Sequence, residues 1–223
     1  MKLYIVSTPI GNLGDITFRA IETLKAVDVI LAEDTRHSQI LLNKYDINKQ
    51  VVSYHSHSGN SKLEKILDFF KEGKECALIS DAGTPGISDP AYSLIQAALE
   101  IGVEIIPIPG ATAILTALVP SGLPMNQFLY LGFLPIKKGR QTVLKSLADE
   151  ERTVVFYESP HRIAKTLSQL EEFVGAQRKI VLARELTKIH EEFIRGTVGE
   201  LNAMFKTRNP KGEFVIVLGG LNY

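Results

Sequence analysis

The stretch 80–90 combines carboxylates, hydroxyls and glycines in one loop, Ser-Asp-Ala-Gly-Thr-Pro-Gly-Ile-Ser-Asp-Pro. Apolar residues 75–79 before it predict a buried strand, and the apolar spacing of residues 91–99 after it predicts a helix. The loop therefore leaves the carboxyl end of a strand, where open α/β sheets bind ligands. Two glycines let the backbone approach a ligand closely. We expect a binding site here; the alternative is a strand-to-helix turn, capped by Ser88 or Asp89 with Pro90 at the first helical position.

Two further polar loops follow predicted strands in the first half. Residues 7–15, after the strand 3–6, contain Gly11 and Gly14 but complete neither a G-x-G-x-x-G fingerprint nor a phosphate-binding G-K-[ST] loop. A nucleotide site of either kind is therefore not predicted. Residues 33–38, after the strand 29–32, hold two acids beside an arginine. They are read equally well as a polar site or as a helix cap with an internal ion pair.

Neither histidine nor cysteine spacing predicts a metal site. His55 and His57 form a His-x-His pair, but no third ligand accompanies them at a suitable spacing. The single cysteine, Cys76, lies in an apolar strand, so disulfides and thiolate clusters are not expected. Lone-cysteine usage fits a reducing compartment, and we expect a cytoplasmic protein without a bound metal.

Composition is that of an ordinary globular protein. The 223 residues are 45% hydrophobic and 22% charged, enough for one large domain or two smaller ones. The longest uncharged apolar stretch, around residues 111–119, is too short to span a bilayer, so no membrane partner is expected. Residues 1–119 hold 10 Lys and Arg against 14 Asp and Glu, and residues 120–223 hold 15 against 11. The basic second half suits an anionic partner, although an ordinary solvated surface explains the excess equally well.

Apolar patterning divides the chain into two α/β halves. Strands at 3–6, 29–32, 51–52, 75–79 and 103–108 alternate with predicted helices, which indicates a parallel sheet with right-handed crossovers. The stretch 120–124, Pro-Ser-Gly-Leu-Pro, breaks this alternation and is the predicted linker. We therefore predict domains at 1–119 and 120–223.

The second half indicates a mixed sheet. Its predicted strands are residues 128–132, 153–157, 179–183, 192–197 and 214–218. Predicted helices end near Leu147 and Val174, and another covers 198–205. Because no helix is predicted between 183 and 192, at least one strand pair should be antiparallel.

Charged residues gather after the strands of this second half, where bases and phosphate-binding cations would be useful. A structural ion pair is an equally good interpretation of each. They are Lys137, Lys138, Arg140, Glu158, His161, Arg162, Arg184, Glu185 and Lys188.

Taken in order, these loops resemble those of the tetrapyrrole methylase superfamily, and most closely its members that methylate ribosomal RNA. The resemblance extends over nearly the whole chain. It rests on residues 7–17, 32–36, 80–90, 108–110, 132–135, 156–162, 183–188 and 211–213.

This resemblance implies a two-domain α/β fold with a mainly parallel five-stranded N-terminal sheet, a mixed C-terminal sheet, and a ligand cleft between the domains. It implies S-adenosylmethionine as cofactor, a homodimer, and transfer of methyl to the ribose 2′-hydroxyl of a cytidine in the decoding region of 16S rRNA, in the small ribosomal subunit. Three alternatives stay open: methylation of a corrin or porphyrin precursor, methylation of another small molecule, and RNA binding without catalysis. Exposed apolar residues at 128–133 would be consistent with the dimer.

The resemblance also implies roles for individual residues. The cofactor-binding positions are Pro9, Ile10, Asp81, Ala82, Gly83, Thr84, Ile87, Thr112, Ala113, Glu158 and Leu186. A ribose hydroxyl needs a base, or a cation that lowers its pKa, and the candidates for this catalytic role are Glu158, Glu185 and Lys188. The candidate RNA contacts are Lys137, Lys138, Arg140, His161, Arg162 and Arg184.

Overall fold

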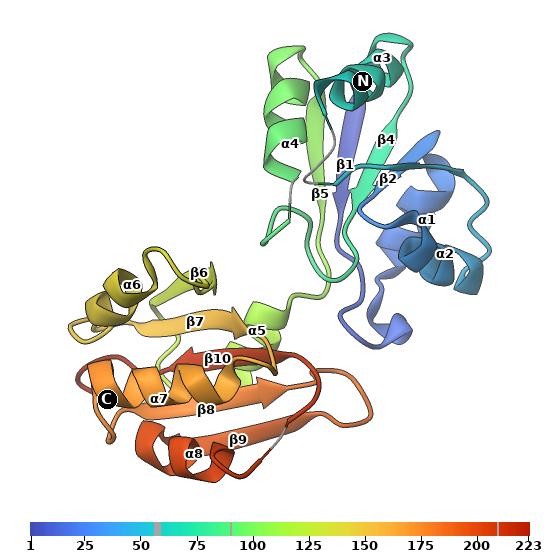
Figure 1. Ribbon diagram of the computed structural model, residues 1–223. Helices are drawn as coiled ribbons and strands as arrows, with labels where there is room; N and C mark the ends of the chain where they lie inside the picture. Colours follow the sequence, from blue (N-terminus) through green and yellow to red (C-terminus); the bar gives the residue numbers. More distant parts are fainter. Residues whose placement is uncertain (56–58, 90, 209) are drawn as a thin grey trace. The chain divides into compact units, whose positions relative to one another are not determined.

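The computed structural model describes residues 1–55, 59–89, 91–208 and 210–223. Its contacts divide the chain into two compact units, Met1–Thr112 and Ala113–Tyr223 (Figure 1). The division comes before helix α5 (Ala113–Leu118), whereas the sequence places it after this helix, between residues 119 and 120. Helix α5 groups with the second unit because it packs against strands β7 (Thr153–Glu158) and β10 (Phe214–Leu218).

The first unit contains a parallel sheet, as the alternating strands and helices predict. Its order is β3-β2-β4-β1-β5, and each neighbouring pair is parallel. The carboxyl ends of the strands therefore meet at one edge, with β1 between β4 and β5. The strands are β1 (Lys2–Val6), β2 (Val29–Ala32), β3 (Gln50–Ser53), β4 (Cys76–Ile79) and β5 (Glu104–Ile108).

Helices cover both faces of this sheet (Figure 1). Successive side chains of a strand point to opposite faces, so Cys76 and Leu78 pack with helices α3 and α4, and Ala77 and Ile79 pack with helices α1 and α2. Burial on both faces explains why β2 and β4 are apolar throughout. The helical segments are η1 (Leu13–Asp15), α1 (Phe18–Ala26), α2 (Thr35–Lys44), α3 (Asn60–Lys71) and α4 (Ala91–Glu100).

The second unit contains the predicted mixed sheet, in the order β6-β7-β10-β8-β9. Strands β6 (Phe128–Phe133) and β7 are parallel, and the other neighbouring pairs are antiparallel. Strands β8 (Lys179–Arg184) and β9 (Glu192–Thr197) form the antiparallel pair that the sequence indicates, joined by turns. Strands β8 and β10 are neighbours, so the end of β8 lies beside the start of β10.

Helices α7 (Ile163–Val174) and α8 (Val198–Phe205) lie side by side on one face of this sheet (Figure 1). Thr197 begins α8 with a capping box: its hydroxyl accepts from the Glu200 backbone, and the Glu200 carboxylate accepts from the Thr197 backbone. Helix α6 (Arg140–Ser146) packs against α7, and the short η2 (Val119–Ser121) continues α5. The core beneath these helices includes Phe156, Leu182 and Ile216.

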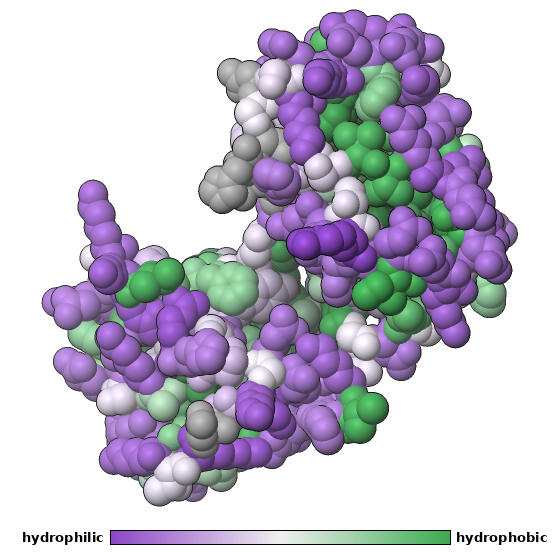
Figure 2. Space-filling view, turned by 45° about the vertical axis from the view of Figure 1, so that its right-hand side comes forward, coloured by the Kyte–Doolittle hydropathy of each residue, from purple (hydrophilic) through white to green (hydrophobic). Residues whose placement is uncertain are grey.

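Figure 2 shows hydrophilic residues over much of the visible surface of each unit, with apolar areas between them. Within the described ranges, the longest apolar helices fall short of what crossing a bilayer requires.

Candidate functional site

The loops that follow β1, β4 and β5 are fastened to one another at the carboxyl edge of the first sheet. The backbone N–H of Thr8 donates to the carbonyl of Gly83 at 2.9 Å, and the N–H of Gly83 donates back at 3.1 Å. The hydroxyls of Ser7 and Thr84 lie 2.9 Å apart, and the Thr84 hydroxyl donates to the carbonyl of Ala111 at 3.4 Å. These bonds make one rigid polar platform from three loops.

Two glycines are required by the close approach of these loops. Gly83 has a φ of +81°, and a Cβ there would lie 3.3 Å from the Cγ2 atom of Ile10. A Cβ on Gly110 would lie 2.9 Å from the Cβ of Ser7, too close for real side chains. The two glycines therefore let the three loops pack closely against one another, and Gly83 is itself buried between them.

The loop after β2 joins the same platform through Asp81. The Oδ1 atom of Asp81 accepts from the backbone N–H of Asp34 at 3.1 Å. Asp34 caps α2 by accepting from the Arg36 backbone at 2.8 Å, and its carboxylate pairs with the Arg36 guanidinium at 2.9 Å. Hydrogen bonds from Arg36 lower the pKa of Asp34 to about 2. Asp34 and Arg36 therefore form the helix cap with an internal ion pair that was one of the two interpretations of this stretch.

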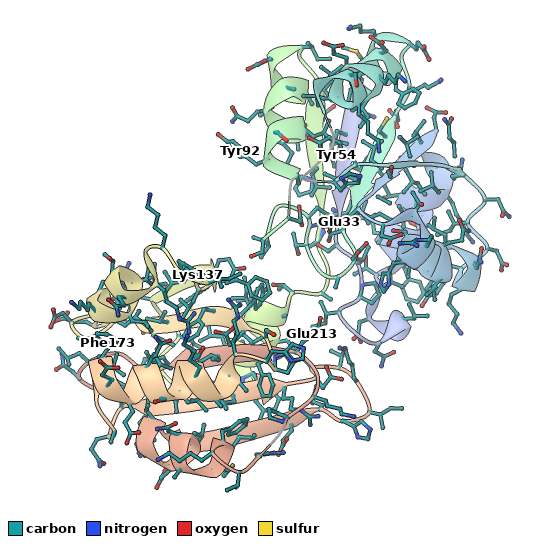
Figure 3. All side chains as sticks on the ribbon, viewed as in Figure 1. Glu33, Tyr54, Tyr92, Lys137, Phe173 and Glu213 are labelled. Atoms are coloured by element: carbon teal, nitrogen blue, oxygen red, sulfur yellow. The ribbon has the colours of Figure 1, made fainter. Side chains whose placement is uncertain are left out.

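A small pocket beside the central loop is lined by residues that include Glu33, Tyr54 and Asp89. Figure 3 labels Glu33 and Tyr54. Burial raises the pKa of Glu33, and the charge of Asp81 raises it further, followed by that of Asp89. The Asp89 carboxylate accepts from the backbone N–H groups of Gly86 at 2.7 Å and Ala91 at 3.0 Å, so it is the cap before α4. Pro90, predicted at the first helical position, lies outside the described residues.

The structure brings the predicted cofactor-binding residues of the first unit together. Pro9 and Ile10 follow the Thr8–Gly83 bridge, and Thr112 follows Ala111, which accepts from Thr84. Ala82 and Ile87 are exposed on the central loop. Ala113, Glu158 and Leu186 belong to the second unit.

Glu158, at the end of β7, is the centre of a buried polar network. Its side chain is inaccessible to solvent; Oε2 accepts from the Thr166 hydroxyl at 2.6 Å, and Oε1 accepts from the Ser159 backbone at 2.8 Å. The Nε atom of Arg162 pairs with Oε1 at 2.8 Å, and Arg140 lies 3.7 Å from Oε2. Both carboxylate oxygens are engaged within the unit, so Glu158 holds the loop that follows β7.

Arg140 does not lie on the surface with its neighbours in sequence. It is 5% exposed, and its guanidinium donates to the Thr166 hydroxyl at 2.6 Å, to Gln169 at 2.8 Å and to the carbonyl of Pro135 at 3.1 Å. Burial lowers the pKa of Arg140, against the attraction of Glu158. The interpretation of Arg140 as an RNA contact is therefore corrected: α6 begins at this residue and turns it inward, where its donors are used.

Lys137, Lys138 and His161, by contrast, are exposed (Lys137 is labelled in Figure 3). The two other arginines of the predicted RNA-binding set are partly engaged. Arg162 pairs with Glu158, and Arg184 donates from Nε to the carbonyl of Lys211 at 2.6 Å.

Lys188 is held between two carboxylates. Its ammonium lies 2.9 Å from Oε1 of Glu185 and 2.8 Å from Oε2 of Glu213. Burial opposes the charge of Glu185, but hydrogen bonds from Lys188 and the Glu213 backbone leave the pKa of Glu185 lowered. Burial likewise opposes the charge of Lys188, but both carboxylates leave its pKa raised. Lys188 and Glu185 are thus charged at neutral pH. Sequence reasoning noted the motif 211–213 but did not single out Glu213, whose partner is 25 residues away in the chain.

The loop that carries these residues is conformationally strained. Glu185 and Thr187 have φ angles of 51° and 65°, in the left-handed region that non-glycine residues rarely occupy. Leu186, between them, is buried. The Thr187 hydroxyl is buried and makes no hydrogen bond to any described atom. Such strain is typical of functional loops, which supports a role for the turn after β8.

Among the described residues, no three His, Cys, Asp or Glu side chains are arranged to hold a metal ion. His57 of the predicted His-x-His pair lies outside those residues.

Comparison with curated proteins gives close relatives. A protein named Ribosomal RNA small subunit methyltransferase I from Synechocystis sp. is 51% identical, over 98% of this chain and 78% of its own length. A protein of the same name from Thermotoga maritima is 48% identical, over 98% of both chains. The one from Bacillus subtilis is 48% identical, over 99% of this chain and 75% of its own.

Solved structures share the fold at lower identity. Cobalt precorrin-4 methyltransferase CbiF aligns with a TM-score of 0.73 and 21% identity, covering 98% of this chain and 94% of its own. A uroporphyrin-III C-methyltransferase from Thermus thermophilus, complexed with S-adenyl homocysteine, aligns with a TM-score of 0.67 and 18% identity, covering 100% and 99%. The family model for tetrapyrrole (corrin/porphyrin) methylases matches residues 2–202. With this match over most of its length, the chain belongs to the tetrapyrrole methylase family.

Proposed function

We propose that the chain is an S-adenosylmethionine-dependent methyltransferase of small-subunit ribosomal RNA, and that it methylates the ribose 2′-hydroxyl of a cytidine in the decoding region of 16S rRNA. The observation that carries the proposal is the identity of 48–51%, over 98% of the chain, to relatives named for that RNA. The tetrapyrrole-modifying structures are 18–21% identical, which supports the fold and not a corrin or porphyrin substrate.

The platform of the first unit suits the proposed methyl donor. The exposed Ala82, with its small side chain, leaves room for the amino-acid part, Thr84 offers a hydroxyl for the ribose, and Ile87 offers an exposed apolar side chain for the adenine. When bound, S-adenosylmethionine supplies an electrophilic methyl group on a sulfonium whose leaving group is a neutral thioether. The protein's task at this site is then to bind and orient, which alone supplies much of a rate enhancement.

The proposed donor-binding residues are the platform residues of the first unit and three positions of the second unit, Ala113, Glu158 and Leu186. Glu158 is proposed to act on donor binding indirectly, because its carboxylate holds the turn from Ser159 to Arg162 in place. The full set is Pro9, Ile10, Asp81, Ala82, Gly83, Thr84, Ile87, Thr112, Ala113, Glu158 and Leu186.

The acceptor hydroxyl presents the harder step, because a ribose hydroxyl is almost entirely protonated at neutral pH. A fixed cation beside it stabilises the alkoxide and lowers its pKa, so that the proton passes to water or to a carboxylate. Lys188 meets this requirement, since its ammonium keeps its charge between Glu185 and Glu213. Lys137, Lys138 and His161 are exposed and are proposed to contact RNA phosphates.

The same proposal includes a homodimer. Strand β6 is at an edge of its sheet, and Phe128 and Phe133 on it are 37% and 54% exposed. An edge strand with exposed aromatic side chains is a ready surface for pairing. Light scattering after size-exclusion chromatography should give twice the mass of the 24.6 kDa chain; a monomer at micromolar concentration would contradict the dimer.

The function is tested by two measurements on the purified protein. Calorimetric titration with S-adenosylmethionine should show binding, and tritiated methyl should pass from the donor to small subunits that lack ribose methylation. RNA that stays unlabelled while a porphyrin precursor becomes labelled would overturn the RNA proposal in favour of the tetrapyrrole one. Absence of donor binding would overturn both.

A further inference from the structure

We propose that residues 211–213 are the positioning element of Lys188: Glu213 holds its ammonium directly, and Gly212 leaves the space in which Glu185 reaches it. The inference rests on the proposed function, because it takes Lys188 as the cation that meets the acceptor ribose. It assigns functions to Gly212 and Glu213, which directly precede β10 and therefore lie beside the turn that follows β8.

The contacts between the two segments are reciprocal. The backbone N–H of Glu185 donates to the carbonyl of Glu213 at 3.0 Å, and the backbone N–H of Glu213 donates to Oε1 of Glu185 at 3.0 Å. That same Oε1 accepts from Lys188 at 2.9 Å, and the Lys188 backbone donates to the carbonyl of Glu185 at 3.0 Å. Glu185 is therefore fixed by Glu213 on one side and fixes Lys188 on the other.

Gly212 makes this geometry possible. Its φ is +92°, and a Cβ built on it would overlap Cγ, Cδ and Oε1 of Glu185. The side chain of Glu185 thus occupies the space where any other residue at position 212 would place its own. A substitution must push the carboxylate away from Lys188.

Glu213 contributes more to placement than to stability. Its side chain is 82% exposed, and ion pairs of exposed groups stabilise folded proteins little. Lys188 itself is 31% exposed, so Glu213 determines where the accessible part of the ammonium points. Loss of the Glu213 carboxylate should therefore lower kcat and leave the stability of the fold nearly unchanged.

The experiment compares Gly212→Ala with Gly175→Ala. Gly175 has a similar φ of +89°, but a Cβ there meets no atom of the described residues within 4 Å. Both variants carry the strain of an alanine at positive φ, and at Gly175 the ψ of 156° adds to that strain. Both should therefore lower Tm by a few degrees. Only Gly212→Ala should lower kcat for methyl transfer to small subunits, by about a hundredfold, the usual penalty of misplacing a reacting group by an ångström.

A second series tests Glu213. Glu213→Gln keeps an oxygen acceptor and should retain more kcat than Glu213→Ala, while Tm, donor affinity and KM for the subunit stay close to wild type. Reductive methylation of Lys188 with formaldehyde, followed by mass spectrometry, measures how strongly Glu185 and Glu213 hold the Lys188 ammonium, and it needs no enzyme assay. Lys188 should react faster in Gly212→Ala and Glu213→Ala than in the wild type, since the free amine becomes more populated.

The outcomes separate the two proposals. Equal kcat loss in Gly212→Ala and Gly175→Ala, or wild-type kcat in Glu213→Ala, would overturn the positioning role. A rate of reductive methylation of Lys188 that is the same in the variants as in the wild type would overturn the positioning role as well, whatever the substrate is. A wild-type protein that transfers no tritiated methyl to small subunits contradicts the proposed function. The rate at which formaldehyde modifies Lys188 then tests the positioning of Lys188 by itself.

Discussion

Thr8 and Gly83, separated by 75 residues in the chain, exchange a pair of backbone hydrogen bonds. The bridge joins the loop after β1 to the loop after β4, although the strands themselves are already paired. Around it, Thr8 donates its hydroxyl to the carbonyl of Ser80 at 3.0 Å, and Ser80 donates its own to the carbonyl of Gly83 at 3.1 Å. Loops fastened in this way keep their shape before a ligand arrives, so little ordering entropy is lost on binding.

Gly83→Ala should weaken donor binding more than it destabilises the fold. Alanine at this φ costs about 1–2 kcal/mol of folding stability, and its Cβ meets Ile10. Gly73 has nearly the same φ, +80°, with no described atom within 4 Å of the added Cβ, and Gly73→Ala is the matched control. Calorimetry should give at least a roughly tenfold weaker Kd, about 1.4 kcal/mol, for Gly83→Ala alone. Equal affinities in the two variants would show that the platform does not bind the donor.

Arg140→Ala should unfold at lower urea concentration than the wild type. Removing one partner of a buried ion pair costs about 3–5 kcal/mol, and Glu158 would keep its buried charge with fewer donors. Lys137→Ala and Lys138→Ala are the controls, because exposed substitutions usually change stability by less than about 0.5 kcal/mol. The two lysine variants should instead bind RNA less tightly at low salt. An Arg140→Ala variant as stable as the controls would contradict the buried network.

Glu33→Gln should stabilise the protein at neutral pH. Burial and the neighbouring acids raise the pKa of Glu33 in the folded state, so its ionised form costs free energy once the pH exceeds the unfolded pKa of about 4.3. Below about pH 4 the carboxyl is protonated in both states, and the gain from glutamine should disappear. Thermal unfolding at pH 4 and pH 7 checks this. A variant whose gain in Tm is larger at pH 4 than at pH 7 would contradict a raised pKa of Glu33 in the folded state.

Cys76 should be inert in the native protein. It is fully buried in β4, and burial raises the pKa of its thiol to about 12. The thiolate is the reactive form, so iodoacetamide should modify Cys76 only after denaturation. Rapid modification of the folded protein, followed by mass spectrometry, would show that β4 opens readily.

Local patterns predicted the elements well where local chemistry decides them. Strand β9 and helix α8 have the predicted bounds, since alternation ends at Thr197 and the capping box with Glu200 begins the helix there. Strand β10 likewise agrees, as a continuous apolar run buried on both faces. The division of the chain was expected after residue 119, and the grouping of helix α5 with the second sheet was not foreseen, because it depends on long-range packing.

The sequence predicted which loops follow the ends of strands. It did not predict which side chains of those loops pair with one another. The stretch 137–140 reads as one basic run, yet Lys137 is exposed and Arg140 is buried against Glu158. Which side of α6 faces the core decides this, and the helix start at Arg140 is set by tertiary contacts. Glu213 was missed for the same reason: its partner Lys188 comes from the turn after the neighbouring strand β8.

The central claim is tested most directly by methyl transfer to small ribosomal subunits that lack ribose methylation. Tritiated donor, purified protein and subunits are incubated, and the labelled RNA is digested and separated into nucleosides. The account predicts label in a 2′-O-methylated cytidine from the decoding region, with turnover lost in Lys188→Ala while donor binding persists. Label on a base, or donor binding without any labelled RNA, would contradict it.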